Sequence, residues 1–217
     1  MKVIIGIISW LPDDDDVRKV RLNRLKELIV KCRQNFELPI MIIAQNYHGD
    51  ELKETSWLKM FNYDKLGITG AREELRKKFL ESSYDYIICL DDDFELSSNK
   101  NAYNEYLRIL SKIPNCLVEY ENYLMNLCAI SRWMFEKMDF DTSVSAELGT
   151  GFEDWVFISV AKSKYPTHCK RIKNLGLPAK KRSELVNDKY STWIDSSVDK
   201  DDLTAKSKDL IKRLSGK

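Results

Sequence analysis

The sequence predicts a single α/β domain in which helices flank a mostly parallel central sheet. Three short runs of apolar, largely β-branched residues recur early in the chain, at 3–10, 40–44 and 85–90, and residues with helical spacing lie between them. Strands that alternate with helices are typical of parallel sheets covered on both faces. Glycine and proline are scarce, at 8 and 5 of 217 residues, which favours regular elements joined by short loops.

The first strand is predicted at 3–10, where nearly every residue is apolar, as expected of a strand buried on both faces. A helix is expected from about 17 to 35, because apolar residues recur at helical spacing from Leu22 to Cys32. The second apolar run, 40–44, follows a proline and predicts the second strand.

The middle of the chain continues the alternation. Residues 50–66 have mixed composition and predict no element. A helix is expected over 71–82, a third buried strand over 85–90 and another helix over 102–112, before Pro114.

The second half of the chain predicts shorter elements. We expect a short strand followed by a helix within 126–138, a helix over about 153–164 and an extended segment over 168–177. The tail from 199 to 214 is charged, with leucines and an isoleucine on one side, and predicts an amphipathic helix.

Composition excludes several classes of protein. Lys and Arg number 35 against 34 Asp and Glu, so the net charge of +1 gives no electrostatic case for a nucleic-acid binder. No apolar stretch approaches the roughly 18 residues of a membrane helix. The five cysteines are widely spaced, and the first residues lack the pattern of a secretory signal, so we expect free thiols and a cytoplasmic protein.

The strongest chemical signal is the run of three carboxylates, Asp91, Asp92 and Asp93, directly after the strand predicted at 85–90. Ligands of parallel sheets bind at the carboxyl ends of the strands, and oxygen ligands favour Mg²⁺, Mn²⁺ or Ca²⁺. A solvated acidic patch is the alternative. The other acidic run, Asp13–Asp16, precedes a helix and is interpreted as an N-terminal cap rather than a donor site.

Two other pairs of polar or aromatic residues follow predicted strands. Ser9 and Trp10 end the first strand, and Gln45 and Asn46 end the second. Trp10 is interpreted either as a core residue or as a surface on which a base or sugar could stack.

A small-residue turn, 67–70, leads into a helix that carries Arg72 in its first turn. Helix N-termini of this kind admit phosphate closely. The helix dipole disfavours a cation there, so Arg72 is more plausible if it meets an anion or a carboxylate such as Asp91. A plain glycine-rich turn is the alternative.

A second glycine-containing loop, 149–152, leads into Glu153 and Asp154 at the start of a helix. Either carboxylate could be a favourable N-terminal charge, or a general base positioned by the loop. The only histidines are His48 and His168, and a lone histidine is more often packed or exposed than a ligand.

Taken together, these features resemble the GT-A fold glycosyltransferases, particularly the family 2-like ones, over roughly residues 3–165. The resemblance rests on the Gly-x-x-Gly-Ala-Arg sequence ending at Arg72, the Asp-x-Asp motif at Asp91–Asp93, and the Gly-Phe-Glu-Asp sequence at 151–154. It implies one Rossmann-like domain with a nucleotide-sugar-binding half at 1–98, an acceptor-side half at 99–194 and an amphipathic C-terminal helix at 195–217.

The resemblance also implies roles for individual residues. On the donor side, the nucleotide would contact Ser9, Trp10, Arg72, Asp91 and Asp92. A Mn²⁺ or Mg²⁺ ion would be bound by Asp93 and Asp91, with His168 as a weaker candidate ligand. On the acceptor side, Asp154 would be the catalytic base, with Glu153 as the other candidate, and residues 126–132 would lie near the acceptor or the donor sugar.

These expectations describe a metal-dependent, inverting glycosyltransferase that moves a sugar from a nucleotide sugar, most plausibly a UDP-sugar, to a glycan, lipid-linked or peptide acceptor. The negative charge that develops on the diphosphate leaving group is stabilised by a metal ion, and the acceptor hydroxyl, a weak nucleophile, needs a base to accept its proton. The alternatives are a nucleotidyltransferase acting on a sugar phosphate and a non-catalytic sugar- or partner-binding module. The C-terminal helix could touch a membrane surface, although packing on its own domain is favoured.

Overall fold

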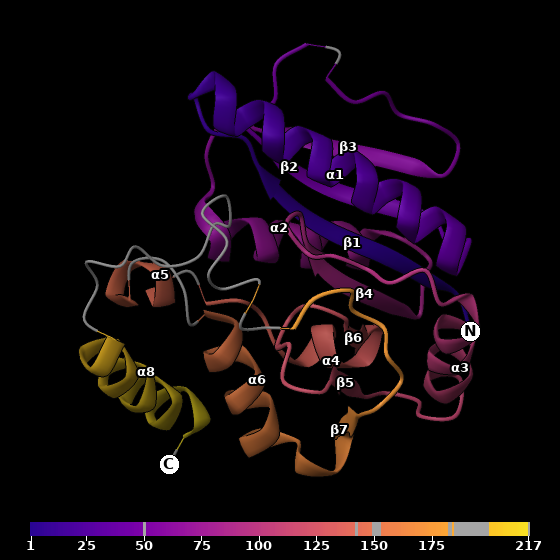
Figure 1. Ribbon diagram of the computed structural model, residues 1–217. Helices are drawn as coiled ribbons and strands as arrows, with labels where there is room; N and C mark the ends of the chain where they lie inside the picture. Colours follow the sequence, from indigo (N-terminus) through magenta and orange to yellow (C-terminus); the bar gives the residue numbers. More distant parts are fainter. Residues whose placement is uncertain (50, 142, 149–152, 182–183, 185–199, 217) are drawn as a thin grey trace.

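The structure is a computed structural model that describes residues 1–49, 51–141, 143–148, 153–181, 184 and 200–216 (Figure 1). The strands are β1 (Val3–Trp10), β2 (Ile40–Gln45), β3 (Leu58–Tyr63), β4 (Tyr86–Asp91), β5 (Leu117–Tyr120), β6 (Cys128–Ser131) and β7 (Cys169–Ile172). The helices are α1 (Asp15–Phe36), α2 (Gly67–Glu81), α3 (Lys100–Leu110), α4 (Arg132–Lys137), α5 (Ser143–Leu148), α6 (Glu153–Lys164), the 3₁₀ turn η1 (Pro166–His168) and α8 (Lys200–Ser215).

Within these residues one seven-stranded sheet runs in the order β3-β2-β1-β4-β6-β5-β7. Strands β1 to β4 are parallel to one another, β7 is parallel to β5, and β6 is antiparallel to both of its neighbours. The chain therefore has the α/β fold with a mostly parallel sheet that the sequence predicts. Trp10 pairs with Gln45, and Ile8 pairs with Asp91, so the polar residues after these strands meet at one edge of the sheet.

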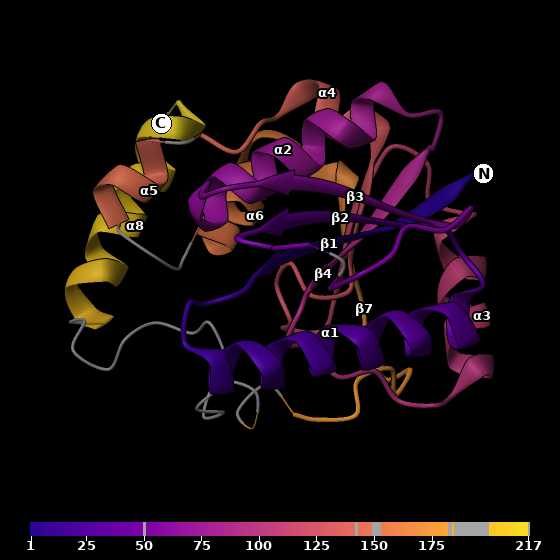
Figure 2. The same cartoon turned by 90° about the horizontal axis from the view of Figure 1, so that it is seen from above.

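Helices cover both faces of the sheet, with α1 and α3 on one side and α2, α4 and α6 on the other (Figure 2). The side chains of a strand alternate between its faces. Ile5 and Ile7 accordingly lie in the core beneath α1 and α3, whereas Ile4 and Ile8 lie in the core beneath α2 and α6. This alternation explains why the strands predicted from continuous apolar runs are buried on both sides.

Helix α2 packs close to the sheet at Gly6 of β1. A Cβ atom at Gly6 would lie 2.4 Å from Ile87 Cδ1 and 3.0 Å from Leu75 Cδ2. Only glycine leaves room there for the side chains of β4 and α2, and this close packing positions the first turn of α2 at the carboxyl edge of the sheet.

The N-terminus of α1 confirms the interpretation of the first acidic run. Asp14 is the N-cap, and its side chain accepts a hydrogen bond of 2.9 Å from the backbone N–H of Val17. Asp15 and Asp16 lie in the first turn, where negative charge is favourable.

Strands β3 and β5 and helix α5 were not expected from the sequence. Strand β3 lies within 50–66 and forms one edge of the sheet, so its exposed Lys59 and Asn62 interrupt the apolar pattern of a buried strand. Helix α5 is only 6 residues long, too short to show a period. The extended segment predicted at 168–177 is strand only at its start, in β7.

The C-terminal helix α8 packs on the domain. Its Leu203 and Leu210 are buried in a cluster with residues of α5 and α6, and Figure 1 shows α8 lying beside both helices. The favoured prediction for this helix is thus confirmed, because its apolar side is covered by the protein itself. No described helix has both the length and the hydropathy needed to cross a membrane.

Candidate active site

The candidate site lies at the carboxyl edge of β1, β2 and β4. Gln45 and Asn46, at the end of β2, support the loops around it. The Gln45 side chain accepts a hydrogen bond of 2.7 Å from the backbone N–H of Leu66, just before α2. The Asn46 side chain donates to the Leu11 carbonyl and to Asp13, each at 2.8 Å. These contacts fix where α2 begins and how the chain leaves β1.

Asp92, the middle carboxylate of the acidic run, is held entirely by the protein. It is only 4% exposed and accepts hydrogen bonds from Ser9 Oγ at 2.6 Å, the Trp10 N–H at 3.3 Å and Arg21 Nη2 at 2.8 and 2.9 Å. A buried carboxylate with this many donors fastens α1 to the end of β1. The sequence placed Asp92 against the nucleotide, whereas the structure gives it a supporting position beneath the site.

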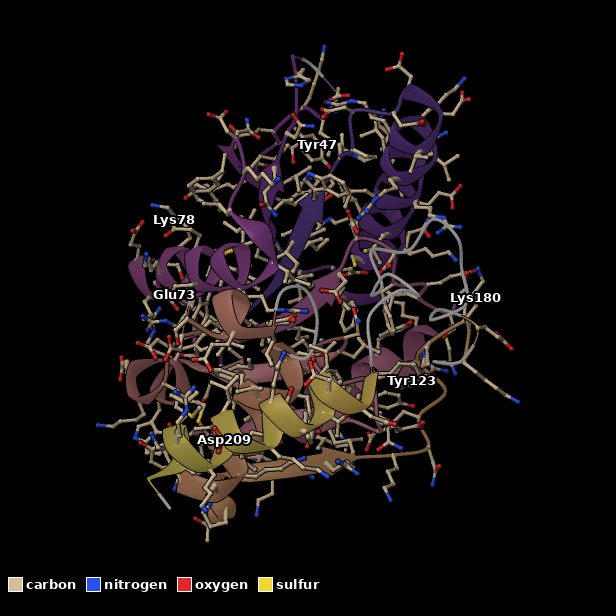
Figure 3. The ribbon with its side chains drawn as sticks, turned by 90° about the vertical axis from the view of Figure 1, so that its left-hand side faces the viewer. Tyr47, Glu73, Lys78, Tyr123, Lys180 and Asp209 are labelled. Carbon is tan, nitrogen blue, oxygen red and sulfur yellow. The ribbon has the colours of Figure 1, made fainter. Side chains whose placement is uncertain are left out.

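Ser9 and Trp10 differ in what they leave exposed. Ser9 is 2% exposed, and because its single hydroxyl proton goes to Asp92, the Tyr47 hydroxyl donates to Ser9, at 2.7 Å (Figure 3 labels Tyr47). Trp10 is 38% exposed, with the Arg21 guanidinium 5.5 Å from its ring centroid. Of the two, Trp10 presents a surface to a ligand, and its ring is steadied by the cation behind it.

Asp91 is oriented by side chains from two other elements. Its Oδ1 accepts from Arg72 Nη2 at 3.1 Å and its Oδ2 from Asn126 Nδ2 at 2.9 Å, while Asn126 Oδ1 accepts from the Asp91 backbone N–H at 2.8 Å. The Asp91 side chain is still 20% exposed. Its orientation is therefore fixed while part of its carboxylate faces solvent.

Sequence reasoning gave Asn126 no role beside Asp91. It precedes β6, and no local pattern marks it as a partner of β4. The contact arises because β6 runs antiparallel to β4, and the Leu127 N–H donates to the Cys89 carbonyl at 2.9 Å. The end of β4 and the start of β6 therefore lie side by side.

Arg72 joins the two acidic motifs. Its guanidinium donates to Asp91 through Nη2 and, through Nε at 3.0 Å, to Glu153 Oε1 at the start of α6. The Arg72 side chain is only 3% exposed, so it acts within the protein rather than as an open phosphate-binding residue. The expectation that Arg72 meets a carboxylate such as Asp91 is confirmed.

Glu153 and Asp154 have different environments. Glu153 is 4% exposed, one of its oxygens is bound to Arg72, and no group in the described part of the chain hydrogen-bonds the other. Asp154 instead accepts from the Trp155 N–H at 2.6 Å and borders a cavity. Glu153 thus holds Arg72, and Asp154 faces the space a ligand could enter.

The Asp154 carboxyl is poised to exchange a proton near neutral pH. Burial raises its pKa to about 7, the negative charge of Glu153 adds to this effect, and Arg72 opposes it. Proton-transfer groups work best when their pKa lies near the working pH, so Asp154 is a stronger candidate base than Glu153.

The carboxylates that follow β4 could supply only part of the ligand shell of a divalent cation. Asp93 lies in the turn that follows β4, next to the oriented Asp91. Among the described residues no group of three or more histidine, cysteine, aspartate or glutamate side chains could enclose a metal ion. Mg²⁺ typically takes one or two protein carboxylates and completes its shell with phosphate and water, and the residues after β4 fit that pattern.

Two expected site residues lie elsewhere. His168 directly precedes β7, which starts at the amino-terminal edge of the sheet, and its ring stacks on Trp133 with Nδ1 3.0 Å from the Asn115 carbonyl. It does not share a site with Asp93. Arg132 caps the C-terminal end of α2 through backbone carbonyls. Gly149, Gly151 and the other residues of the predicted 149–152 loop lie outside the described residues.

Several solved structures share this fold. S. aureus TarS 1-349 in complex with UDP-GlcNAc superimposes with a TM-score of 0.64 at 12% sequence identity, covering 99% of this chain and 66% of that one. The complex of TarS 1-349 with UDP gives a TM-score of 0.61 at 10% identity, covering 99% and 65%. A longer TarS structure gives 0.58 at 10% identity, covering 82% and 36%.

At these identities the likeness shows the fold, and the chain has a GT-A-like fold. It spans about a third of the longer TarS chain and just under two thirds of TarS 1-349. No protein-family model and no curated protein matches the sequence.

Proposed function

We propose that this chain is an inverting glycosyltransferase that moves a sugar from a nucleotide-sugar donor to an acceptor hydroxyl. The observation that carries the proposal is the link through Arg72. One buried guanidinium holds Asp91, at the donor edge of the sheet, and Glu153, next to the candidate base Asp154. A transferase needs its leaving-group site and its base at a fixed separation, and this arrangement supplies that.

A UDP-sugar is the donor we favour. The two TarS complexes that superimpose over 99% of this chain hold UDP and UDP-GlcNAc. In this chain, the exposed ring of Trp10 at the end of β1 is suited to stacking on a base.

Asp93, with Asp91 beside it, is the residue we expect to hold Mg²⁺ or Mn²⁺ carried by the donor diphosphate. Such an ion, when bound, stabilises the negative charge that develops on the departing diphosphate. The chain's own contribution is to orient Asp91 through Arg72 and Asn126, which leaves the Asp93 turn at a fixed place.

Asp154 acts on the acceptor. A hydroxyl is a weak nucleophile, and a carboxylate with a pKa near 7 can accept its proton as the oxygen attacks the sugar. With a base and no nucleophile from the protein, attack occurs on the face opposite the leaving group, and the anomeric configuration inverts, as in inverting glycosidases.

The test is a thermal-shift titration with UDP, with and without Mn²⁺, on the wild-type chain and on Asp93→Asn. A ligand that binds the folded state raises its melting temperature by mass action. We expect a shift that needs both UDP and Mn²⁺ and that is lost in Asp93→Asn. Asp16→Asn is the matched control, because Asp16 lies in the other acidic run, on the exposed first turn of α1.

The titration, combined with a turnover assay, distinguishes a transferase from a binding module. Binding of UDP and Mn²⁺ without turnover of UDP-GlcNAc or other UDP-sugars, alone or with sugar acceptors, would favour a binding module with this fold. Absence of any shift with UDP, GDP, CDP and dTDP would refute a diphosphate site at Asp91–Asp93.

A further inference from the structure

A cavity of about 500 Å³ lies beside Asp154. Its lining residues come from other elements than β1, β2 and β4, whose carboxyl ends form the proposed donor site. One face of α6 forms its long wall, through Asp154, Trp155, Ile158 and Lys162. The facing wall comes from the end of β5 and the connection after it, from β7, and from Thr204 of α8. The cavity therefore begins at the candidate base and runs along the helix that carries it.

The far end of this cavity is cationic. Glu119 of β5 is 1% exposed, and Lys162 Nζ lies 2.5 Å from its Oε2 while Arg171 Nη2 lies 3.4 Å from its Oε1. Arg171 also donates to Asn122 Oδ1 at 3.1 Å. Two cations thus meet one carboxylate, and the Lys162 and Arg171 side chains remain 40% and 39% exposed. The excess positive charge faces the cavity.

The sequence around this end is strongly basic although the whole chain is nearly neutral. Residues 155–181 contain seven Lys and Arg residues and neither Asp nor Glu. Acidic side chains from other segments offset part of this charge: Glu119 does so inside the cavity, and Glu95 pairs with Lys180 at 2.9 Å (Figure 3 labels Lys180). Lys170 and Lys173 are exposed, which leaves the β7 edge positive.

The two ends of the cavity therefore differ in charge. At the first end Asp154 stands beside Glu153 and Asp91, and these carboxylates repel an anion. At the other end Lys162 and Arg171 attract one. Lys162 follows Asp154 by eight positions along α6, which corresponds to a rise of about 12 Å. Between them, Leu124, Trp155 and Ile158 provide an apolar wall.

We propose that this cavity is the acceptor site and that it selects an anionic acceptor. The acceptor places a hydroxyl at Asp154 and a phosphate or carboxylate group at Lys162 and Arg171, and the part of the molecule between them packs on the apolar wall. The proposal rests on the proposed function, because Asp154 must be the base for the bound hydroxyl to be the one that reacts.

The experiment compares two small probes by titration calorimetry at low ionic strength. The probes are 4-carboxyphenyl β-D-glucopyranoside and 4-methylphenyl β-D-glucopyranoside, which share a sugar and a ring and differ in the charge at the far end. We expect the carboxylate probe to bind the wild-type chain about two- to fivefold more tightly, which is the effect of one partly exposed charge pair.

Arg171→Gln and, separately, Lys162→Gln should each reduce this preference, with little change for the neutral probe. Lys170→Gln is the matched control. Lys170 neighbours Arg171 on β7 but points to the opposite face of the sheet, and it is exposed. It should keep the wild-type preference. An unchanged affinity for the neutral probe shows that each variant is folded. Because the two substitutions are made separately, the test can still be carried out if one of the variants does not fold.

Three results would overturn the proposal: equal affinity of the wild-type chain for both probes, a preference that survives both substitutions, or no binding of either probe. A parallel series of the same kind with aryl phosphates in place of the carboxylate decides between the two anionic groups. Binding of UDP and Mn²⁺ is measured on the same samples. If the chain prefers the carboxylate probe but does not bind UDP and Mn²⁺, the proposed function is refuted and an anion-binding cavity remains. If it binds UDP and Mn²⁺ but shows no preference for the carboxylate probe, only the anionic acceptor is refuted.

Discussion

Asp91 and Asp92 are adjacent on one strand end, yet they belong to two different parts of the molecule. Asp92 turns toward α1 and is enclosed with Arg21, each side chain being 4% exposed. Asp91 turns toward α2 and pairs with Arg72, but its own side chain remains 20% exposed. Because consecutive residues of a strand face opposite sides, one acidic motif supplies a buried fastening on one face and an open, oriented carboxylate on the other.

The comparison shows that a buried ion pair can support a site without belonging to it. The Arg21–Asp92 pair holds α1 at the carboxyl edge of the sheet, and with each side chain only 4% exposed it offers little to a ligand. The Arg72 pair connects Asp91 to Glu153, which neighbours the proposed base Asp154. We expect substitutions in the first pair to change stability and substitutions around the second to change activity.

The largest expected effect is on transfer in Asp154→Asn. General-base catalysis contributes about 10²- to 10⁴-fold, and the amide cannot accept the proton, so kcat should fall by that factor. UDP binding should be retained, because the role proposed for Asp154 is to act on the acceptor and not on the nucleotide. Steady-state transfer from UDP-GlcNAc or another UDP-sugar and UDP titration measure the two properties. Normal transfer in this variant would exclude Asp154, and Glu153 would become the candidate base.

The next effect is on stability in Arg21→Met. Removal of one partner from a buried ion pair leaves the other charge uncompensated, so we expect the free energy of unfolding to fall by about 3–5 kcal/mol. Urea denaturation measures the loss. Arg18→Met is the control, because Arg18 also lies on α1 and pairs with Glu51, which is 21% exposed, so its loss should be smaller. Equal losses in the two variants would contradict the distinction drawn here.

Arg72→Gln should combine a loss of activity with a change in its pH dependence. The positive charge of Arg72 lowers the pKa of Asp154, so removing it raises that pKa further and moves the acid limb of the pH–rate profile to higher pH. Misplacement of Asp91 should lower kcat/KM by about ten- to hundredfold. A lower rate with an unchanged pH profile would show that Arg72 acts on Asp91 alone.

The last expected effect is a pH-dependent gain of stability in Asp154→Asn. The folded protein holds the Asp154 proton up to a pKa of about 7, against an ordinary value of 3.8, so the wild type loses stability as the pH rises between these values. The variant, which has no such proton, should melt at a higher temperature than the wild type above pH 7 and at the same temperature near pH 3. Melting curves without divalent cations test this, and a pH-independent difference would contradict the raised pKa.

The sequence by itself determined most of the fold. Continuous apolar runs predicted β1, β2 and β4, and helical spacing predicted α1 and α2, because burial on both faces or on one stripe leaves a local pattern. The half-exposed edge strand β3 and the six-residue α5 left no such pattern. The sequence also placed the acidic run at the carboxyl edge of the sheet, since that position follows directly from the strand before it.

Only the tertiary structure decided which acidic residue does what. Asp91 and Asp92 are the same residue type at neighbouring positions, and their environments differ because Arg21 and Arg72 come from helices on opposite faces of the sheet. Asn126 and Glu119 come from separate segments with no motif, and their partners lie 35 and 52 residues away along the chain. Contacts of this range depend on how strands pair, which local periodicity does not record.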